Sequence, residues 1–285
     1  MTTQDWLLSN TRALQNAGID SARLDCLILL EDVTARDRAW LLAHPEHQLD
    51  ELQVQKLQGW THRRSEHVPM AYIRDHSEFY GRRFTVTPQV LVPRPESESM
   101  IDVLKGFVAA RNNASVHTKT SREAKSLTIL DIGTGSGALA ITAALEITGA
   151  HVIGCDIDPQ CLTVAHANAQ ALGANCDFVA SDLLSADLRS QCNPPTVILA
   201  NLPYVPTDYP INRAASHEPA TALFAGADGL NDYRRLWAQL TEVLPEAVIT
   251  ESLEDQHPAL AALAAQAGYR LNATDGLAQL FIPIY

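Results

Sequence analysis

The feature that most constrains the fold is an alternation of two periodicities from residue 127 onward. Short β-branched runs alternate there with longer segments of helical spacing. Strands are predicted at 127–131, 151–156, 176–180, 196–200 and 246–251, and helices at 137–147, 159–172 and 230–243. Such an order is typical of a doubly wound, mostly parallel α/β sheet, to which the apolar alternation in 269–285 adds one or two closing strands.

The residues before this region show different patterns. Helical spacing of apolar residues over 1–70 predicts a small helical bundle. Residues 78–92 predict a β-hairpin with its turn near Gly81. A helix is expected from about residue 97 to 110, and residues 111–126 are expected to form an exposed, irregular linker.

Composition and charge narrow the class of protein. With 46% hydrophobic and 19% charged residues, the 285-residue chain is typical of a globular protein with one large or two modest domains. No apolar run approaches the roughly 18 residues of a membrane span, so no membrane partner is expected. The net charge is −12, and residues 91–285 carry 11 basic against 21 acidic residues. This balance counts against nucleic acid as the direct substrate.

The cysteines and the N-terminus indicate the compartment. The five cysteines are scattered without a Cys-x-x-Cys pair, which predicts reduced thiols and no metal site. The first six residues are acidic and polar, unlike a secretory signal. We therefore expect a cytoplasmic protein, and we expect it to be a monomer.

A glycine loop comes directly after the first strand of the alternating region. Asp131 ends that strand, and Gly133, Gly135 and Gly137 come next in a Gly-x-Gly-x-Gly pattern that opens a helix. Glycines let the backbone approach a ligand, and a helix N-terminus offers unpaired N–H groups, although structural turns share the pattern. Asp131 is expected to face the crevice at the sheet edge, where it can pair with a cationic amino group.

Acidic residues end the next two strands. Asp156 lies about 20 residues beyond the glycine loop, where a carboxylate commonly holds ribose hydroxyls. Helix capping before Pro159 suits Asp158 better. Asp182 can accept a hydrogen bond from an adenine amino group while Leu183 packs on the ring; a solvated turn is the equal alternative.

The fourth strand, 196–200, runs directly into Asn201-Leu202-Pro203-Tyr204. An amide, a proline-stiffened backbone and an aromatic face suit the holding of a flat, nitrogen-bearing group at the carboxyl edge of the sheet. An ordinary turn is the alternative for this cluster taken alone.

Taken together, these strand ends resemble the S-adenosylmethionine-dependent methyltransferases, which have a Rossmann-like sheet. The Asn201–Tyr204 motif resembles the Asn-Pro-Pro-Tyr class, which methylates planar amide or exocyclic amine nitrogens. Several further blocks resemble the HemK-like (PrmC-like) release factor glutamine N5-methyltransferases. These blocks are residues 22–25, 28–31, 68–73, 78–80, 91–98, 217–230 and 233–234.

The resemblance implies a division of the chain and a set of site residues. It implies an N-terminal helical substrate-recognition domain (1–75), a β-hairpin bridge (76–95) and a methyltransferase domain (96–285). It also implies S-adenosylmethionine as the cofactor and peptide chain release factors as the protein substrate. The implied cofactor-binding residues are Asp131, Gly133, Thr134, Gly135, Gly137, Asp156, Ile157, Asp182, Leu183 and Asn201. The implied substrate-binding residues are Arg94, Glu96, Asn201, Leu202, Pro203, Tyr204 and Glu218, of which Asn201, Leu202 and Tyr204 are the catalytic ones.

The expected reaction is methyl transfer to the side-chain amide nitrogen (N5) of a glutamine in the release-factor Gly-Gly-Gln motif. The Asn201 side-chain oxygen and the Leu202 carbonyl are expected to accept the two amide N–H bonds, and Tyr204 to cover the flat face. Leu202 stands where the family has proline, so the carbonyl is kept while the fixed φ is lost and an N–H is gained. The chain also departs from the family at Glu251-Ser252-Leu253 and in the 275–279 segment.

Other functions are also compatible with parts of the sequence. An rRNA or DNA adenine N6-methyltransferase fits the Asn-Leu-Pro-Tyr motif, but the charge, the front domain and the 217–230 block oppose it. A glutamine of a ribosomal protein is another possible acceptor. A non-catalytic module that kept a cofactor fold is favoured by Leu202 and opposed by Asn201 and Tyr204.

Charged residues outside the strand ends have two interpretations each. Arg94, Glu96 and Glu98 either shape a substrate entrance or form a salt-bridged hinge. The pairs at residues 63–64 and 82–83 either dock a release factor or belong to an ordinary solvated face.

Overall fold

The computed structural model describes residues 1–117, 126–185, 188–189, 196–240 and 243–284. By its internal contacts, the chain divides into two compact units. One unit comprises Met1–His76 with Ile211–His217, and the other comprises Ser77–Pro210 with Glu218–Tyr285.

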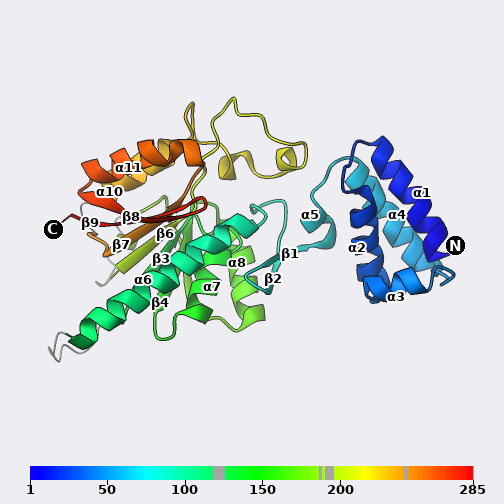
Figure 1. The fold of residues 1–285 in the computed structure, drawn as a ribbon, viewed down its shortest axis with the longest axis horizontal. Helices are drawn as coiled ribbons and strands as arrows, with labels where there is room; N and C mark the ends of the chain where they lie inside the picture. The colour runs from blue at the N-terminus through cyan, green and yellow to red at the C-terminus, as the bar shows by residue number, and fades with distance from the viewer. Residues whose placement is uncertain (118–125, 186–187, 190–195, 241–242, 285) are drawn as a thin grey trace. The chain divides into compact units, whose positions relative to one another are not determined.

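The larger unit is built on a seven-stranded sheet with the order β5-β4-β3-β6-β7-β9-β8 (Figure 1). Strands β3 to β7 pair in parallel, while β9 pairs antiparallel with both β7 and β8. The strands are β3 (Thr128–Ile132), β4 (His151–Asp156), β5 (Cys176–Ala180), β6 (Thr196–Ala200), β7 (Ala247–Glu251), β8 (Tyr269–Asp275) and β9 (Ala278–Pro283). The predicted doubly wound, mostly parallel sheet is confirmed, and of the one or two closing strands expected the structure has two, β8 and β9.

Helices cover both faces of this sheet because the side chains of each strand alternate between the faces. Ile129 packs in one apolar cluster with residues of α6, α7 and α8, and Leu130 packs in the other with residues of α10 and α11. The helices are α6 (Glu98–His117), α7 (Ala138–Glu146), α8 (Pro159–Leu172), α10 (Asn231–Gln239) and α11 (His257–Gln266). Among the described residues, no helix combines the length and apolar character needed to cross a membrane.

The strand order places a topological switch point between β3 and β6. The chain proceeds from β3 outward to β4 and β5, and then returns to β6 on the other side of β3. Asp131 lies opposite Gly154 of β4 and Leu199 of β6, so the carboxyl ends of these strands are level. In open α/β sheets a ligand binds in the crevice at such a point.

The smaller unit is a helical bundle, as its apolar spacing predicts. Its helices are α1 (Thr3–Asn16), α2 (Ala22–Thr34), α3 (Arg38–Ala43), α4 (Glu51–Ser65) and α5 (Met70–Arg74). Asp50 and Gln53 form a capping box that begins α4. The buried carboxylate of Asp25 accepts a 2.7 Å hydrogen bond from Arg64, which ties α2 to α4.

A hairpin of β1 (His76–Phe79) and β2 (Arg82–Thr85) comes after the bundle in the chain, as predicted. Tyr80 and Gly81 both have positive φ angles, as in a two-residue turn of type I′. The backbone N–H of Tyr80 donates to Glu98 at the start of α6, and Thr85 exchanges hydrogen bonds with Asn168 of α8.

The predicted irregular linker at 111–126 is wrong in its first part, because α6 continues to His117. Arg111 forms a 2.6 Å ion pair with Glu246, which holds this end of the helix against a segment distant in sequence. Residues 118–125 of the predicted linker lie outside the described residues. The helix predicted at 230–243 ends at Gln239.

All four arginines of the predicted docking pairs make intramolecular contacts. Arg63 donates to the carbonyl of Tyr72, Arg64 pairs with Asp25, and Arg82 pairs with Glu146. These contacts favour a structural role for the pairs over a docking role.

Candidate active site

A cavity of about 370 Å³ opens at the switch point, within the size range of small-molecule sites. It is lined by residues at the ends of β3, β4, β5 and β6, by the 219–224 segment and by α10. The lining residues from the predicted site are Gly133, Gly135, Asp156, Ile157, Asp182, Leu183, Asn201, Leu202 and Pro203. The structure therefore brings together most of the residues that the sequence marked at separate strand ends.

The glycine loop forms one wall of the cavity. Gly133 and Gly135 have positive φ angles of 76° and 54°, which favour glycine. The N–H groups of Gly133 and Thr134 donate to the carbonyl of Cys155, so the loop is tied to β4. The N–H of Gly135 donates to Asp156 over 2.9 Å. The loop thus presents bare backbone to the cavity in a fixed conformation.

The prediction that Asp131 faces the crevice is wrong. Asp131 is 1% exposed, and its Oδ2 accepts hydrogen bonds from Thr134 Oγ1 (2.6 Å) and from the N–H of Ala140 (3.0 Å). Burial raises the pKa of this carboxyl to about 6. Asp131 therefore braces the glycine loop and the start of α7 from beneath.

Thr134 and Gly137 also lie outside the cavity lining. Thr134 is buried and directed at Asp131. At Gly137, φ is 81°, and a Cβ atom would lie 2.8 Å from Ile141 Cδ1 and 3.1 Å from Ala165 Cβ. Gly137 accordingly permits the close packing of α7 on α8, which is a structural role.

Asp156 lies in the cavity wall as predicted. Its carboxylate accepts hydrogen bonds from the N–H groups of Gly135 and Asp158, and burial raises its pKa. Asp158 caps α8 by accepting from the N–H of Gln160 over 2.8 Å, so the predicted capping role of Asp158 is confirmed. The adjacent Ile157 is 69% exposed and lines the cavity with an apolar surface.

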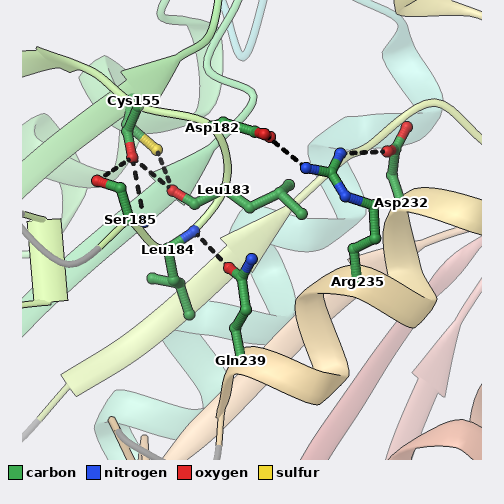
Figure 2. A network of polar contacts seen from close by, with 9 residues as sticks. Cys155, Asp182, Leu183, Leu184, Ser185, Asp232, Arg235 and Gln239 are labelled. Carbon is green, nitrogen blue, oxygen red and sulfur yellow. Dashed lines mark hydrogen bonds and ion pairs between the residues drawn. The ribbon is translucent and has the colours of Figure 1, made fainter.

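Residues of the turn after β5 also line the cavity, and Figure 2 shows the polar contacts of this turn. Asp182 and Leu183 are the lining residues, and Leu183 has a positive φ of 52°, unusual for a residue with a side chain. Arg235 of α10 donates to Asp182 over 2.6 Å and also lines the cavity. Arg235 gave no signal at the sequence level because its partner is 53 residues away.

The Asn201 amide is held in one orientation. Its Nδ2 donates to Ser97 Oγ over 2.9 Å, and Ser97 is buried at the start of α6. The buried carboxylate of Glu251, at the end of β7, accepts from Tyr204 Oη over 2.8 Å. Burial raises the pKa of Glu251, and hydrogen bonds from Ser97, Tyr204 and Asn201 oppose that rise. Because Nδ2 is committed to this cluster, Oδ1 is the amide atom left for a ligand.

Tyr204 itself does not line the cavity. Its hydroxyl contacts Glu251, and burial beside that carboxylate raises its pKa. Its carbonyl accepts a 2.7 Å hydrogen bond from Gln256. Ser97 and Glu251, which the sequence did not assign to the site, are therefore what fix the ends of the Asn201–Tyr204 segment.

Leu202 is buried at 3% exposure and packs beneath the glycine loop. A Cβ atom on Gly133 would lie 3.3 Å from Leu202 Cδ2. The neighbouring Tyr233 Oη lies within hydrogen-bond distance of the carbonyls of Ala200 and Glu251, next to this segment, and its single O–H can donate to either one. Side-chain packing thus restrains Leu202, at the position where the Asn-Pro-Pro-Tyr motif has a proline.

Arg94, Glu96 and Glu218 lie outside the cavity lining. Arg94 forms a 2.5 Å ion pair with Glu218, whose side chain is 1% exposed, and Glu218 also accepts from the N–H of Val92. Of the two interpretations of Arg94, this ion pair favours the salt bridge over the substrate entrance. Glu96 lines a separate open depression with Glu254 and Leu277.

The fold and the cavity define a Rossmann-like methyltransferase domain. A methyltransferase domain family matches residues 129–216, and the family described as the PrmC N-terminal domain matches residues 5–74. The hMettl16 catalytic domain, solved with the MAT2A 3'UTR hairpin 6, has a TM-score of 0.52 at 13% identity and covers 83% of each chain, which shows a shared fold.

Sequence relatives define the family more narrowly. The Bacillus cereus release factor glutamine methyltransferase is 36% identical over 78% of this chain and 76% of its own length. The relative of the same name from Koribacter versatilis is 36% identical over 86% of this chain and 83% of its own length. The one from Bacillus subtilis is 33% identical over 82% of this chain and 78% of its own length. The chain belongs to the release factor glutamine methyltransferase family.

Proposed function

We propose that this protein transfers a methyl group from S-adenosylmethionine to the side-chain amide nitrogen of a glutamine in a peptide chain release factor. The observation that carries the proposal is the fixed Asn201 amide beside a cavity suited to the cofactor. Family membership adds independent support, because the relatives are named for release factor glutamine methylation.

The residues of the cavity fit S-adenosylmethionine. Gly133 and Gly135 leave room for close approach, and Asp156 offers carboxylate oxygens of the kind that hold ribose hydroxyls. Asp182 offers a carboxylate oxygen at the other end, while Ile157, Leu183 and Leu202 supply apolar surface. When bound, the cofactor supplies a methyl group attached to a cationic sulfur, and the S–C electron pair stays on the sulfur as the methyl group is transferred.

The chain's own contribution is alignment. An amide nitrogen is a poor nucleophile because its lone pair is delocalised, so the alignment of the two reactants matters for the rate. Correct orientation can lower the activation barrier by on the order of 7–11 kcal/mol. Asn201 Oδ1 and the Leu202 carbonyl accept hydrogen bonds from the two N–H groups of the glutamine amide. These bonds direct its nitrogen toward the methyl group. They also stabilise positive charge as it develops on that nitrogen, and a proton leaves after the N–C bond forms. The Tyr204 hydroxyl, held by Glu251 outside the cavity lining, fixes the end of the segment that carries these two acceptors.

A comparison of acceptors tests this proposal. Purified protein is incubated with methyl-labelled S-adenosylmethionine and a release factor, a release factor whose Gly-Gly-Gln glutamine is replaced by asparagine, or ribosomal RNA. Label in the first sample alone supports the proposal. Label in the asparagine variant at the wild-type level, or in RNA alone, would contradict it.

We also infer that the helical unit is the substrate-recognition domain. A cavity of about 470 Å³ lies among α1, α2 and α3, and exposed Leu8 and Leu42 are part of its lining. Arg12 and Arg23 line it too, and they are the two cations of residues 1–76, all of them described, that have no hydrogen-bond, ion-pair or ring partner. Apolar surface beside unpaired arginines suits an acidic amphipathic segment of a protein.

Charge reversal at these two arginines tests the docking role. The Arg12→Glu/Arg23→Glu variant should raise the KM for release factor about tenfold, because rim charges steer association, and should leave cofactor affinity unchanged. Arg36→Glu is the matched control, since Arg36 lies over the Trp40 ring and is not part of this cavity. An unchanged KM in the double variant would reject docking at this surface.

A further inference from the structure

Helix α10 holds the turn after β5 at two points (Figure 2). Arg235 Nη2 donates to Asp182 Oδ2 over 2.6 Å, and Gln239 Oε1 accepts from the N–H of Leu184 over 2.9 Å. Arg235 and Gln239 are four residues apart, so they project from the same side of the helix. The turn between their contacts lines the cavity through Asp182 and Leu183.

The same turn is also held by one of its own residues and by a residue of β4. Ser181 Oγ donates to the carbonyl of Leu183 over 2.8 Å, and Cys155 Sγ lies 3.9 Å from the same oxygen. Leu183 is thereby kept at its positive φ of 52°, a strained conformation for a residue with a side chain. These contacts and those from α10 hold a strained turn in one position, which indicates that the position of Asp182 and Leu183 in the cavity wall is important for binding a ligand.

The contact between Arg235 and Asp182 contributes little to stability. Both side chains are about half exposed, at 49% and 50%, and surface ion pairs of this kind add little to the free energy of folding. Arg235 also donates to Asp232 over 3.2 Å, so one guanidinium lies between two carboxylates that both line the cavity. Without this cation the two carboxylates would repel each other, and Asp182 would lose its fixed orientation.

The geometry leaves one oxygen of Asp182 for a ligand. Oδ2 is taken by Arg235, and among the described residues Oδ1 has no hydrogen-bond partner. An ionised carboxylate accepts hydrogen bonds and cannot donate them. It therefore favours a base with an exocyclic amino group and repels one that presents a carbonyl oxygen at the same place.

We propose that Arg235 and Gln239 are positioning residues that fix the Asp182–Leu183 turn and thereby set the preference of the cavity for adenine over hypoxanthine. This inference rests on the proposed function, because it takes the base to be that of S-adenosylmethionine. Arg235 acts through Asp182, and Gln239 acts through the backbone of Leu184.

Binding measurements with two product analogues test the inference without turnover. S-adenosylhomocysteine and its 6-oxo counterpart, S-inosylhomocysteine, are titrated calorimetrically into wild type, Arg235→Ala, Arg235→Lys and Gln239→Ala. Arg235→Ala should lower the affinity for S-adenosylhomocysteine about tenfold, as expected for the loss of one hydrogen bond to a charged group. The affinity for S-inosylhomocysteine should change by less than about twofold. Arg235→Lys should recover part of the preference, and Gln239→Ala should lower it by a smaller factor.

Arg234→Ala is the matched control. Arg234 neighbours Arg235 on α10 and pairs with the exposed Asp228, but it does not line the cavity. It should leave both affinities unchanged. Equal weakening of both analogues by Arg235→Ala, or no change in either, would overturn the inference. Failure of the wild type to bind S-adenosylhomocysteine would overturn the proposed function as well, so the two failures are distinguishable.

Discussion

The orientation of the Asn201 amide gives the sharpest test of the proposed site. The hydrogen bond from Asn201 Nδ2 to Ser97 Oγ, 2.9 Å long, keeps Oδ1 available to the acceptor glutamine. In Ser97→Ala this bond is lost, while Glu251 can still accept from the amide. A neutral hydrogen bond contributes about 1 kcal/mol, which corresponds to about a fivefold loss of kcat.

Asn201→Ala removes the acceptor itself and should cost much more. Removing one preorganised group from a charge-stabilising site typically costs about 3 kcal/mol, or about 10²-fold in kcat. The affinity for S-adenosylhomocysteine should change by less than about twofold in both variants, because the cavity keeps its other contacts.

The assay is single-turnover methyl transfer to a release factor at saturating cofactor, with affinity measured separately by calorimetry. Ser99→Ala is the matched control, because Ser99 Oγ donates to the carbonyl of Glu96 at the exposed start of the same helix. Its rate should equal that of wild type. A wild-type rate in Ser97→Ala, or an equal fall of rate and cofactor affinity in Asn201→Ala, would refute the assigned role of the amide.

Two further changes test the support of the glycine loop. Because burial raises the pKa of Asp131 to about 6, above its value of 3.8 in an unfolded chain, its favourable contribution is complete below about pH 3.8 and is lost as the pH rises through 6. The loss amounts to about 3 kcal/mol, so Asp131→Asn should flatten this part of the pH profile of unfolding free energy in urea; an unaltered profile would contradict the assignment. Gly137→Ala should lower the free energy of unfolding by about 2–4 kcal/mol. Its φ is positive, and the added Cβ would also clash with Ile141 and Ala165. Gly149→Ala, also at positive φ but with open space around its Cβ, should cost only about 1–2 kcal/mol, and equal costs would rule out the packing role.

Most of the fold can be predicted from the sequence because each strand ends in a local signal. The apolar run 196–200, the glycine loop and the acidic residue at 156 each specify a strand and the segment after it. Parallel pairing then brings the carboxyl ends together at one edge, which is why Asp156 and Asn201 line one cavity.

The parts that sequence reasoning missed depend on contacts between distant residues. Ser97 is 104 residues from Asn201, and Arg235 is 53 from Asp182, so no local pattern marks either pair. Asp131 has the correct place in sequence, but the side chain turns beneath the loop because Thr134 and the start of α7 offer hydrogen bonds there. Sequence position fixes the strand end and leaves side-chain direction open.

A protein glutamine is the proposed methyl acceptor. The most direct measurement is peptide mapping by mass spectrometry of a release factor after incubation with the protein and S-adenosylmethionine. We predict a single added methyl group on the side-chain nitrogen of the Gly-Gly-Gln glutamine, present with wild type and reduced about 10²-fold in rate with Asn201→Ala. An unmodified glutamine in the presence of wild-type protein that binds cofactor, or a methyl group on another residue, would contradict the claim.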